Sequence, residues 1–157
     1  EFNDKLPCFL PGTLISTPNG EVPIETIKEN SIIYDQNKEE IKVGSVHSWT
    51  TTNFTVGTIP YVIPKDSLQE NYPNENLYVS PFHKIRLPNG DFKIVCNINL
   101  PFIKQMKNSN GILKHNEKQI SEIKYYNLVL PNNSNYIANG IIVESLDKSN
   151  HLITSIR

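Results

Sequence analysis

Residues 7–24 read PCFLPGTLISTPNGEVPI, and this stretch holds both a clear strand signal and an unusually placed cysteine. Apolar residues at 14–17 and 22–24 flank a Pro-Asn-Gly turn, and Asn-Gly between apolar runs favours a tight β-hairpin. Cys8 stands just upstream of this hairpin, directly after Pro7, and is one of two cysteines in the chain. A thiol in this position can attack the peptide carbonyl before it, so the stretch predicts a hairpin and a candidate nucleophile.

The same hairpin pattern returns later in the chain. Ile15-x-x-Pro-Asn-Gly-Glu-x-x-Ile24 is matched by Ile85-x-x-Pro-Asn-Gly-Asp-x-x-Ile94, at a constant offset of 70 residues. Pro-Asn-Gly turns are common, so two similar hairpins can arise independently. The alternative is a duplicated half-domain, which predicts a fold with pseudo-twofold symmetry.

Short apolar runs separated by turn residues continue through the 157 residues, which predicts one compact all-β domain. Residues 24–30 and 99–106 are the only modest helical candidates, and 50–76 and 107–119 have the composition of long connections. The remaining predicted strands lie at 32–34, 41–46, 61–63, 77–79, 83–87, 92–95, 120–123, 125–130, 136–137 and 141–143.

Composition argues against several classes of function. The formal net charge of -1 provides no electrostatic footprint for nucleic acid or a membrane surface. No apolar run is long enough to span a bilayer, and the first residues do not resemble a signal peptide. The two cysteines do not form a disulfide framework, and no Cys/His spacing fits a metal site. We therefore expect a monomer without metal or cofactor.

An attack by Cys8 on the Pro7 carbonyl needs three further contributions from the fold. The leaving nitrogen must be protonated, the oxyanion must be stabilised, and the bond must be held in attacking geometry. His83 is the natural acid, since it alone of the four histidines lies in a compact block with a nearby hydroxyl, Ser80. In a duplicated fold position 83 pairs with position 13, which would bring His83 to the Cys8 end of the first hairpin.

Three blocks of the chain resemble the Hint family, the self-cleaving module of inteins, hedgehog C-terminal domains and bacterial intein-like domains. They cover nearly the whole chain in the family's order. Cys8 to Ile15, followed by 20–27, is similar to the N-terminal block that the nucleophilic Cys leads. Ser80-x-x-His83 is similar to the family's Thr-x-x-His, and 126–130 with 135–143 is similar to the closing strand pair.

The resemblance implies a Hint fold and a single-turnover, cysteine-dependent self-cleavage. It implies Cys8 as nucleophile, His83 as the group that activates the scissile amide, and Ser80 as its hydrogen-bonding support. Thr13, Asn127 and Asn139 are weaker candidates for framework or oxyanion roles; many inteins carry Asp where this chain has Asn127. The implied substrate is the upstream polypeptide, with water or a small nucleophile as second reactant.

The C-terminal block departs from the splicing pattern. Inteins end in His-Asn before a nucleophile, whereas Val143 is followed here by Glu144-Ser145, and Ser134 replaces a frequent His. We therefore expect an N-to-S acyl shift at Pro7–Cys8 followed by hydrolysis or acyl transfer, without splicing. The expected boundaries are 1–7 for an upstream remnant, 8–145 for the Hint domain and 146–157 for an extension. Glu1-Phe2 is what a cloning site encodes, so part of that remnant can be artificial.

The alternative is a catalytically slow or inactive Hint-like module with a structural or interaction role. Pro7 favours this alternative, because a hindered tertiary amide is a poor acyl donor. Free cysteines are usually buried hydrophobic residues, and lone histidines usually pack or face solvent. Cys96 is expected in the core, and the three other histidines, His47, His115 and His151, are expected to be solvated.

Overall fold

A computed structural model describes residues 6–147, which form β-strands, turns and single 3-10 turns, without an α-helix in that range. The prediction of an all-β fold is confirmed. The strands are β1 (Leu14–Thr17), β2 (Gly20–Pro23), β3 (Ile32–Tyr34), β4 (Glu40–Lys42), β5 (Ser45–Thr51), β6 (Tyr61–Ile63), β7 (Leu77–Val79), β8 (Lys84–Arg86), β9 (Phe92–Ile94), β10 (Lys104–Gln105), β11 (Asn108–Ser109), β12 (Ile112–His115), β13 (Lys118–Ile120), β14 (Ile123–Val129), β15 (Tyr136–Ala138) and β16 (Ile141–Val143). The 3-10 helices are η2 (Ile24–Thr26), η3 (Val95–Asn97) and η4 (Pro131–Asn133).

The central sheet has the order β2-β1-β15-β16-β8-β9 and is antiparallel throughout. The late hairpin β15–β16 therefore lies between the two hairpins that the sequence repeat predicts. β1 joins β15 at Ile15↔Ala138, and β16 joins β8 at Val143↔Ile85. The two repeated isoleucines thus occupy equivalent places on either side of the sheet centre.

Hydrogen bonds before each repeated hairpin match as well. The N–H of Thr13 donates to the Leu10 carbonyl over 3.4 Å, and the N–H of His83 donates to the Ser80 carbonyl over 3.3 Å. The turn glycines, Gly20 and Gly90, have φ of 101° and 97°, a left-handed conformation that favours glycine. The predicted pseudo-twofold fold is confirmed, and it makes position 83 the structural counterpart of position 13.

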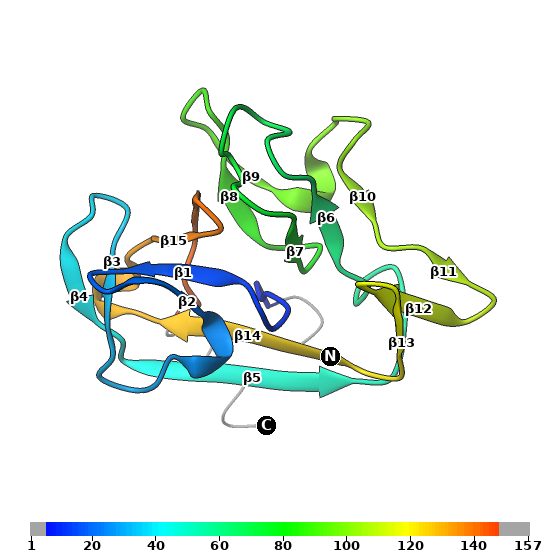
Figure 1. The fold of residues 1–157 in the computed structure, drawn as a ribbon, viewed down its shortest axis with the longest axis horizontal. Helices are drawn as coiled ribbons and strands as arrows, with labels where there is room; N and C mark the ends of the chain where they lie inside the picture. The colour runs from blue at the N-terminus through cyan, green and yellow to red at the C-terminus, as the bar shows by residue number, and fades with distance from the viewer. Residues whose placement is uncertain (1–5, 148–157) are drawn as a thin grey trace.

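A long two-stranded ribbon, β5–β14, runs along one side of the molecule, and β6 to β9 lie on the opposite side (Figure 1). Two expectations are wrong. Residues 107–119 form the meander β11-β12-β13 instead of an irregular connection, and the helical candidate at 99–106 ends in strand β10. The candidate at 24–30 shortens to the single 3-10 turn η2.

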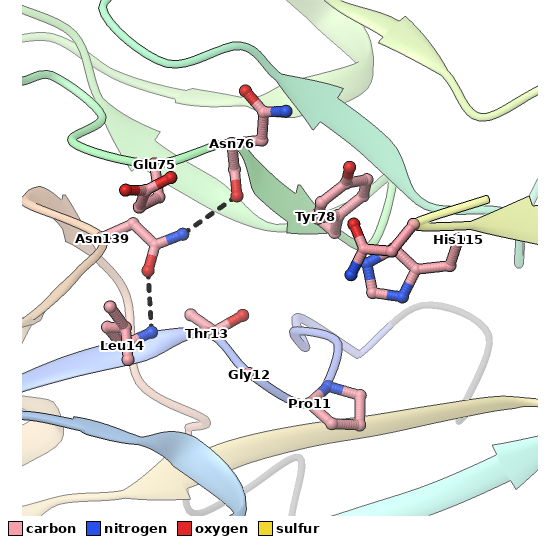
Figure 2. A pocket seen from close by; sticks show the side chains of 10 residues that line it. Pro11, Gly12, Thr13, Leu14, Glu75, Asn76, Tyr78, His115 and Asn139 are labelled. Carbon is pink, nitrogen blue, oxygen red and sulfur yellow. Dashed lines mark hydrogen bonds between the residues drawn. The ribbon is translucent and has the colours of Figure 1, made fainter. Parts of the chain in front are cut away.

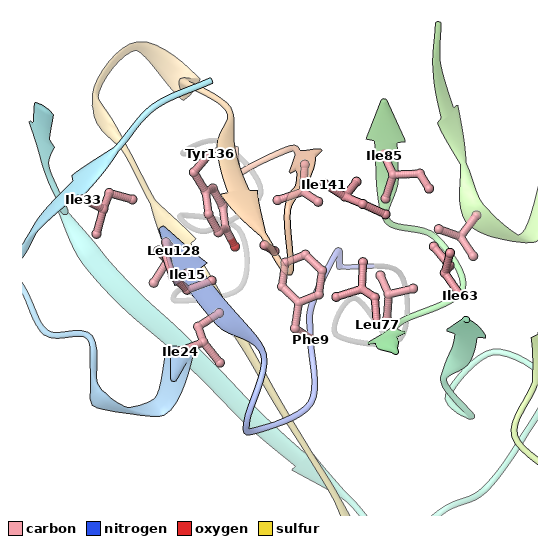
Figure 3. Packing of buried hydrophobic residues seen from close by; sticks show 14 of the residues in the cluster. Phe9, Ile15, Ile24, Ile33, Ile63, Leu77, Ile85, Leu128, Tyr136 and Ile141 are labelled. Carbon is pink, nitrogen blue, oxygen red and sulfur yellow. The ribbon is translucent and has the colours of Figure 1, made fainter. Parts of the chain in front are cut away.

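Phe9 anchors the N-terminal segment in the main core. Its side chain is fully buried and lies among Tyr136, Ile141 and Leu77 in Figure 3. Its backbone exchanges two hydrogen bonds of 2.8 Å with Tyr126 of β14. Because both the N–H and the carbonyl of Phe9 are bound to β14, the preceding peptide has a defined position against that strand.

A second buried cluster surrounds Cys8. Leu6, Cys8 and Leu10 pack there with residues of β12 and β14, including Leu113 and Tyr125. Leu6 is only 5% exposed, so a residue upstream of the predicted cleavage point is part of the folded interior. The backbone N–H of Leu10 completes the attachment by donating to the Tyr78 carbonyl over 3.2 Å.

Candidate active site

Side chains from two distant segments hold the Pro7–Cys8 peptide on both sides. Asn127, in the middle of β14, donates from Nδ2 to the Pro7 carbonyl oxygen over 2.6 Å. The Cys8 N–H donates over 2.8 Å to Oγ of Ser80, the residue that directly follows β7. The carbonyl that the thiol would attack and the nitrogen that would leave are therefore both bound.

The Asn127 carboxamide is fixed before any reaction begins. Its Oδ1 accepts from the Leu128 N–H over 2.7 Å and from the Tyr136 hydroxyl over 2.5 Å. These two donors identify the oxygen and leave the amide NH₂ facing Pro7. A donor already aimed at the carbonyl oxygen can stabilise an oxyanion there without reorganisation.

Ser80 holds the backbone around the predicted junction by three hydrogen bonds. Besides accepting from Cys8, its hydroxyl donates to the Leu6 carbonyl over 3.2 Å. Its own N–H donates to the Cys8 carbonyl over 2.9 Å. The side chain is buried, so these contacts restrain the peptide out of bulk water.

His83 lies beside this peptide but does not contact its nitrogen in the hydrogen bonds of the structure. Nδ1 is 3.4 Å from the Cys8 carbonyl oxygen, Nε2 is 2.9 Å from the Glu144 carbonyl oxygen, and the ring packs on Phe9 with centroids 4.3 Å apart. Burial lowers the pKa of His83 to about 4, although both carbonyl contacts favour the protonated form. The neutral ring therefore donates from Nε2 to Glu144, the shorter contact, and leaves Nδ1 on the Cys8 side.

Ionisation of the Cys8 thiol is also unfavourable in the folded protein. It is fully buried, and burial raises its pKa to about 12, with a smaller opposing contribution from Trp49. At neutral pH Cys8 is thus a protonated thiol and His83 an uncharged imidazole.

Thr13 and Asn139 are framework residues and do not touch the Pro7–Cys8 peptide in the hydrogen bonds of the structure. Thr13 Oγ1 donates to the Leu10 carbonyl over 2.8 Å. Asn139 accepts from the Leu14 N–H over 2.7 Å and donates to the Asn76 carbonyl over 3.1 Å, which ties β1 to the β15–β16 turn.

Both framework side chains line a polar pocket of about 260 Å³ (Figure 2). The pocket also includes Gly12, Asn76, Tyr78 and His115, and its lining does not include Cys8, His83 or Asn127. It therefore adjoins the N-terminal segment without forming part of the site.

Several residues around the site were missed or misjudged from sequence. His47 is half-buried instead of solvated and lies directly opposite Asn127 in the β5–β14 register. His115 is also half-buried, with its ring edge-on to Tyr78 at 4.4 Å. Cys96 is half-exposed at η3 instead of in the core, and His151 lies outside the described residues.

The contributions of Trp49, Tyr136 and Glu144 were not anticipated. Each depends on strand pairing, because Trp49 reaches the site through β5, Tyr136 through β15 and Glu144 through its position after β16. No local sequence signal predicts these neighbours, because the register of β5 against β14 and of β15 against β16 is a long-range property. Within residues 6–147, no group of three metal-binding side chains occurs, and no helix there is long and apolar enough to cross a membrane.

Comparison with known proteins gives a consistent result. The family described as Hint domain matches residues 7–150. A variant of the Ssp DnaB mini-intein shares 17% identity, with 90% of this chain and 94% of that chain covered and a TM-score of 0.59. An intein-like domain from Clostridium thermocellum shares 18%, with 88% and 98% covered and a TM-score of 0.59.

A DnaB intein from Synechocystis sp. PCC 6803 shares 16% identity, with 88% of this chain and 98% of that chain covered and a TM-score of 0.58. At these identities the solved structures support the fold alone. No curated protein matches the chain.

Proposed function

Because the chain belongs to the Hint domain family, we propose that it is a self-processing domain that breaks its own Pro7–Cys8 bond. The reaction is an N-to-S acyl shift. Cys8 Sγ forms a bond to the Pro7 carbonyl carbon, the bond from that carbon to the Cys8 nitrogen breaks, and the thiol proton ends on the freed amine. Water or a small thiol then attacks the thioester and releases the upstream polypeptide.

The observation that carries this proposal is the hydrogen bond from Asn127 Nδ2 to the Pro7 carbonyl oxygen. Negative charge develops on this oxygen as sulfur adds to the carbonyl. The 2.6 Å contact and the two bonds that fix Asn127 Oδ1 support its role as the oxyanion donor.

The leaving nitrogen needs a different group. Ser80 accepts the Cys8 N–H and orients the nitrogen, while His83 Nδ1, unprotonated and on the Cys8 side of its ring, takes the thiol proton and passes it to the nitrogen. Nε2 keeps the ring in place by donating to the Glu144 carbonyl. Splicing is not part of the proposal, because Glu144-Ser145 replaces the His-Asn pair that would cyclise.

The substrate in this proposal is the domain's own upstream chain, residues 1–7 and whatever precedes them. The processing domain spans 8–145, and 146–157 is an extension. The acyl shift takes place within one chain, so beyond water or a small nucleophile the proposed reaction needs no second subunit, cofactor or nucleic acid.

The second candidate, an inactive Hint-like module, is favoured by the ionisation of the site. The pKa of Cys8 is about 12 and that of His83 about 4, so direct proton transfer from thiol to imidazole is uphill by on the order of 10 kcal/mol. Pro7 adds a hindered acyl group to this barrier. These two features predict either a slow reaction or a module that no longer cleaves its own chain.

A reporter fused upstream of Asn3 separates the two candidates. The fusion is incubated with and without dithiothreitol, and the products are weighed by mass spectrometry. We expect thiol-stimulated release of a reporter ending at Pro7, faster with Pro7→Gly and absent with Cys8→Ala. If the Pro7→Gly fusion stays intact over days from neutral to mildly alkaline pH, the self-processing proposal is wrong.

A further inference from the structure

Trp49 is one of the half-buried side chains at the edge of the cluster that contains Cys8. It is the only tryptophan in the chain and packs against the buried cluster that contains Cys8. Its direct partner across the β5–β14 ribbon is Tyr125, and the two rings lie 5.5 Å apart with an angle of 31° between their planes. Cross-strand partners leave a ribbon on the same side, so both rings face the cluster.

The indole N–H of Trp49 is a buried donor without a partner. Nε1 is shielded from solvent and has no hydrogen-bond acceptor among residues 6–147. An indole nitrogen can only donate, and an unpaired donor in the interior is costly. Such a group in a native fold calls for an explanation, and catalytic use is one of them.

Four neighbouring ionisable groups, Tyr125, Tyr136, His83 and Glu144, supply no positive charge for a negative sulfur near neutral pH. Burial raises the pKa of Tyr125 and Tyr136, and it lowers the pKa of His83 to about 4, so all three are uncharged near neutral pH. Burial also raises the pKa of Glu144, whose charge would oppose a thiolate. A further titratable group on the same face of β5 is His47, which lies two residues before Trp49.

Of the groups around Cys8, the Trp49 side chain is the one that favours its ionised form. Burial dominates and raises the pKa of the thiol, while the Trp49 side chain acts in the opposite direction. A neutral thiol is a weak acceptor and leaves the indole unpaired, whereas a thiolate is a strong acceptor at the same place.

We propose that Trp49 stabilises the thiolate, donating a hydrogen bond from Nε1 to Cys8 Sγ as the thiol proton leaves. This inference rests on the self-cleavage proposed above and adds a residue to it. Trp49 keeps its own proton throughout the acyl shift. It acts only on the negative charge that develops on sulfur before the bond to the Pro7 carbonyl carbon forms.

The test removes the N–H and keeps an aromatic ring against Tyr125. In the reporter fusion, Trp49→Phe should slow cleavage about 10- to 100-fold, the effect of losing a charged hydrogen bond. In a Cys8→selenocysteine fusion, whose selenol ionises at lower pH, the same substitution should cost less than about threefold. Ser48→Ala, on the exposed side of β5, is the matched control and should change neither rate.

Two outcomes would overturn the inference. An equal loss in the thiol and selenol proteins would mean that Trp49 acts through packing alone. The second readout is the selenol pKa, measured by absorbance, which Trp49→Phe should raise by about one to two; an unchanged value refutes the role. This titration decides the role of Trp49 even if neither fusion cleaves, whereas absence of cleavage with Trp49 in place refutes the proposed function.

Discussion

Replacing Asn127 tests the oxyanion role most directly. In Asn127→Ala the Pro7 carbonyl oxygen loses its 2.6 Å donor. Removal of one oxyanion donor typically slows a reaction about 100- to 1,000-fold, or about 2.7–4 kcal/mol. We expect thioester formation to slow by that factor in the reporter fusion.

The same substitution also affects folding. The Tyr136 hydroxyl and the Leu128 N–H both donate to Asn127 Oδ1, and both would become unpaired in the interior. Each unpaired group costs about 1–3 kcal/mol, so the free energy of unfolding should fall by roughly 2–6 kcal/mol. This is a large part of the 5–15 kcal/mol typical of a domain, so the alanine variant alone cannot separate catalysis from stability.

Asn127→Asp separates the two effects. One carboxylate oxygen can accept from Tyr136 and Leu128 as before, while the other faces the Pro7 carbonyl oxygen without a proton to donate. Burial and this oxygen should raise the pKa of the new carboxyl group, and its protonated form can donate again. Cleavage should therefore recover as the pH falls through that raised pKa, whereas the thiol of the parent favours alkaline pH.

Rates are measured by mass spectrometry in the Pro7→Gly fusion, and urea unfolding is measured with Cys8→Ala so that the chain stays intact. The decisive comparison is the Asn127→Asp variant under conditions where it is as folded as the parent. A rate within about threefold of the parent, with the parent's pH profile, would refute the oxyanion role.

Three further predictions concern the groups around the junction. Ser80→Ala leaves the buried Cys8 N–H unpaired and should lower the free energy of unfolding by about 1–3 kcal/mol in urea titrations; recovery in Ser80→Thr is the control, and an unchanged midpoint would contradict the contact. His83 has a pKa of about 4 when folded and an ordinary value of 6.5, so its contribution is present above pH 6.5 and is lost as the pH falls toward 4. Urea titrations should show up to about 3 kcal/mol of acid destabilisation from this group, and His83→Phe should remove it; the same acid slope in both proteins would exclude it. Tyr136→Phe frees one side of the Asn127 carboxamide and should slow cleavage up to about tenfold at a cost of about 1 kcal/mol in stability, and an unchanged cleavage rate would show that this restraint is unnecessary.

The fold could be predicted from the sequence where local signals repeat. The two Pro-Asn-Gly turns require left-handed glycines at Gly20 and Gly90, and the apolar residues beside them must pack on one core. The sequence offset predicted their symmetry, and the order and register of the central sheet confirm it. The two hairpins match at an offset of 70 residues up to their turns. After the turns the match shifts by one residue, because the bond from Ile24 N–H to Thr13 O corresponds to the bond from Val95 N–H to His83 O. The loop of the second hairpin is therefore one residue longer than that of the first.

Elements without such local signals were not predicted correctly from the sequence. The β11-β12-β13 meander is rich in Asn, Lys and Gly, and most of its side chains are exposed, so its strands lack apolar alternation. The candidate helix at 99–106 follows an apolar spacing that serves core packing at Ile103 and Met106, with β10 between them. Tertiary pairing decided both segments.

Part of the candidate site could also be predicted from local sequence signals. Cys8, Ser80 and His83 stand in compact local blocks, and the structure brings them to one peptide. The donor role of Asn127 depends on which residue of β14 faces Pro7, and the proximity of Trp49 depends on the β5–β14 register. Both are long-range properties that one sequence does not encode locally.

Burial of Leu6 has a consequence for what happens after the bond breaks. This residue lies on the substrate side of the junction, yet it is 5% exposed and its carbonyl accepts from Ser80. Full burial of a leucine contributes about 1.5–3 kcal/mol, which is less than the roughly 4 kcal/mol of a millimolar complex, so Leu6 alone would not keep a cleaved upstream polypeptide docked on the domain. In the intact chain the same burial stabilises the fold, so the residues just before the junction contribute to the stability of the precursor, and that contribution would be lost once the proposed cleavage releases them.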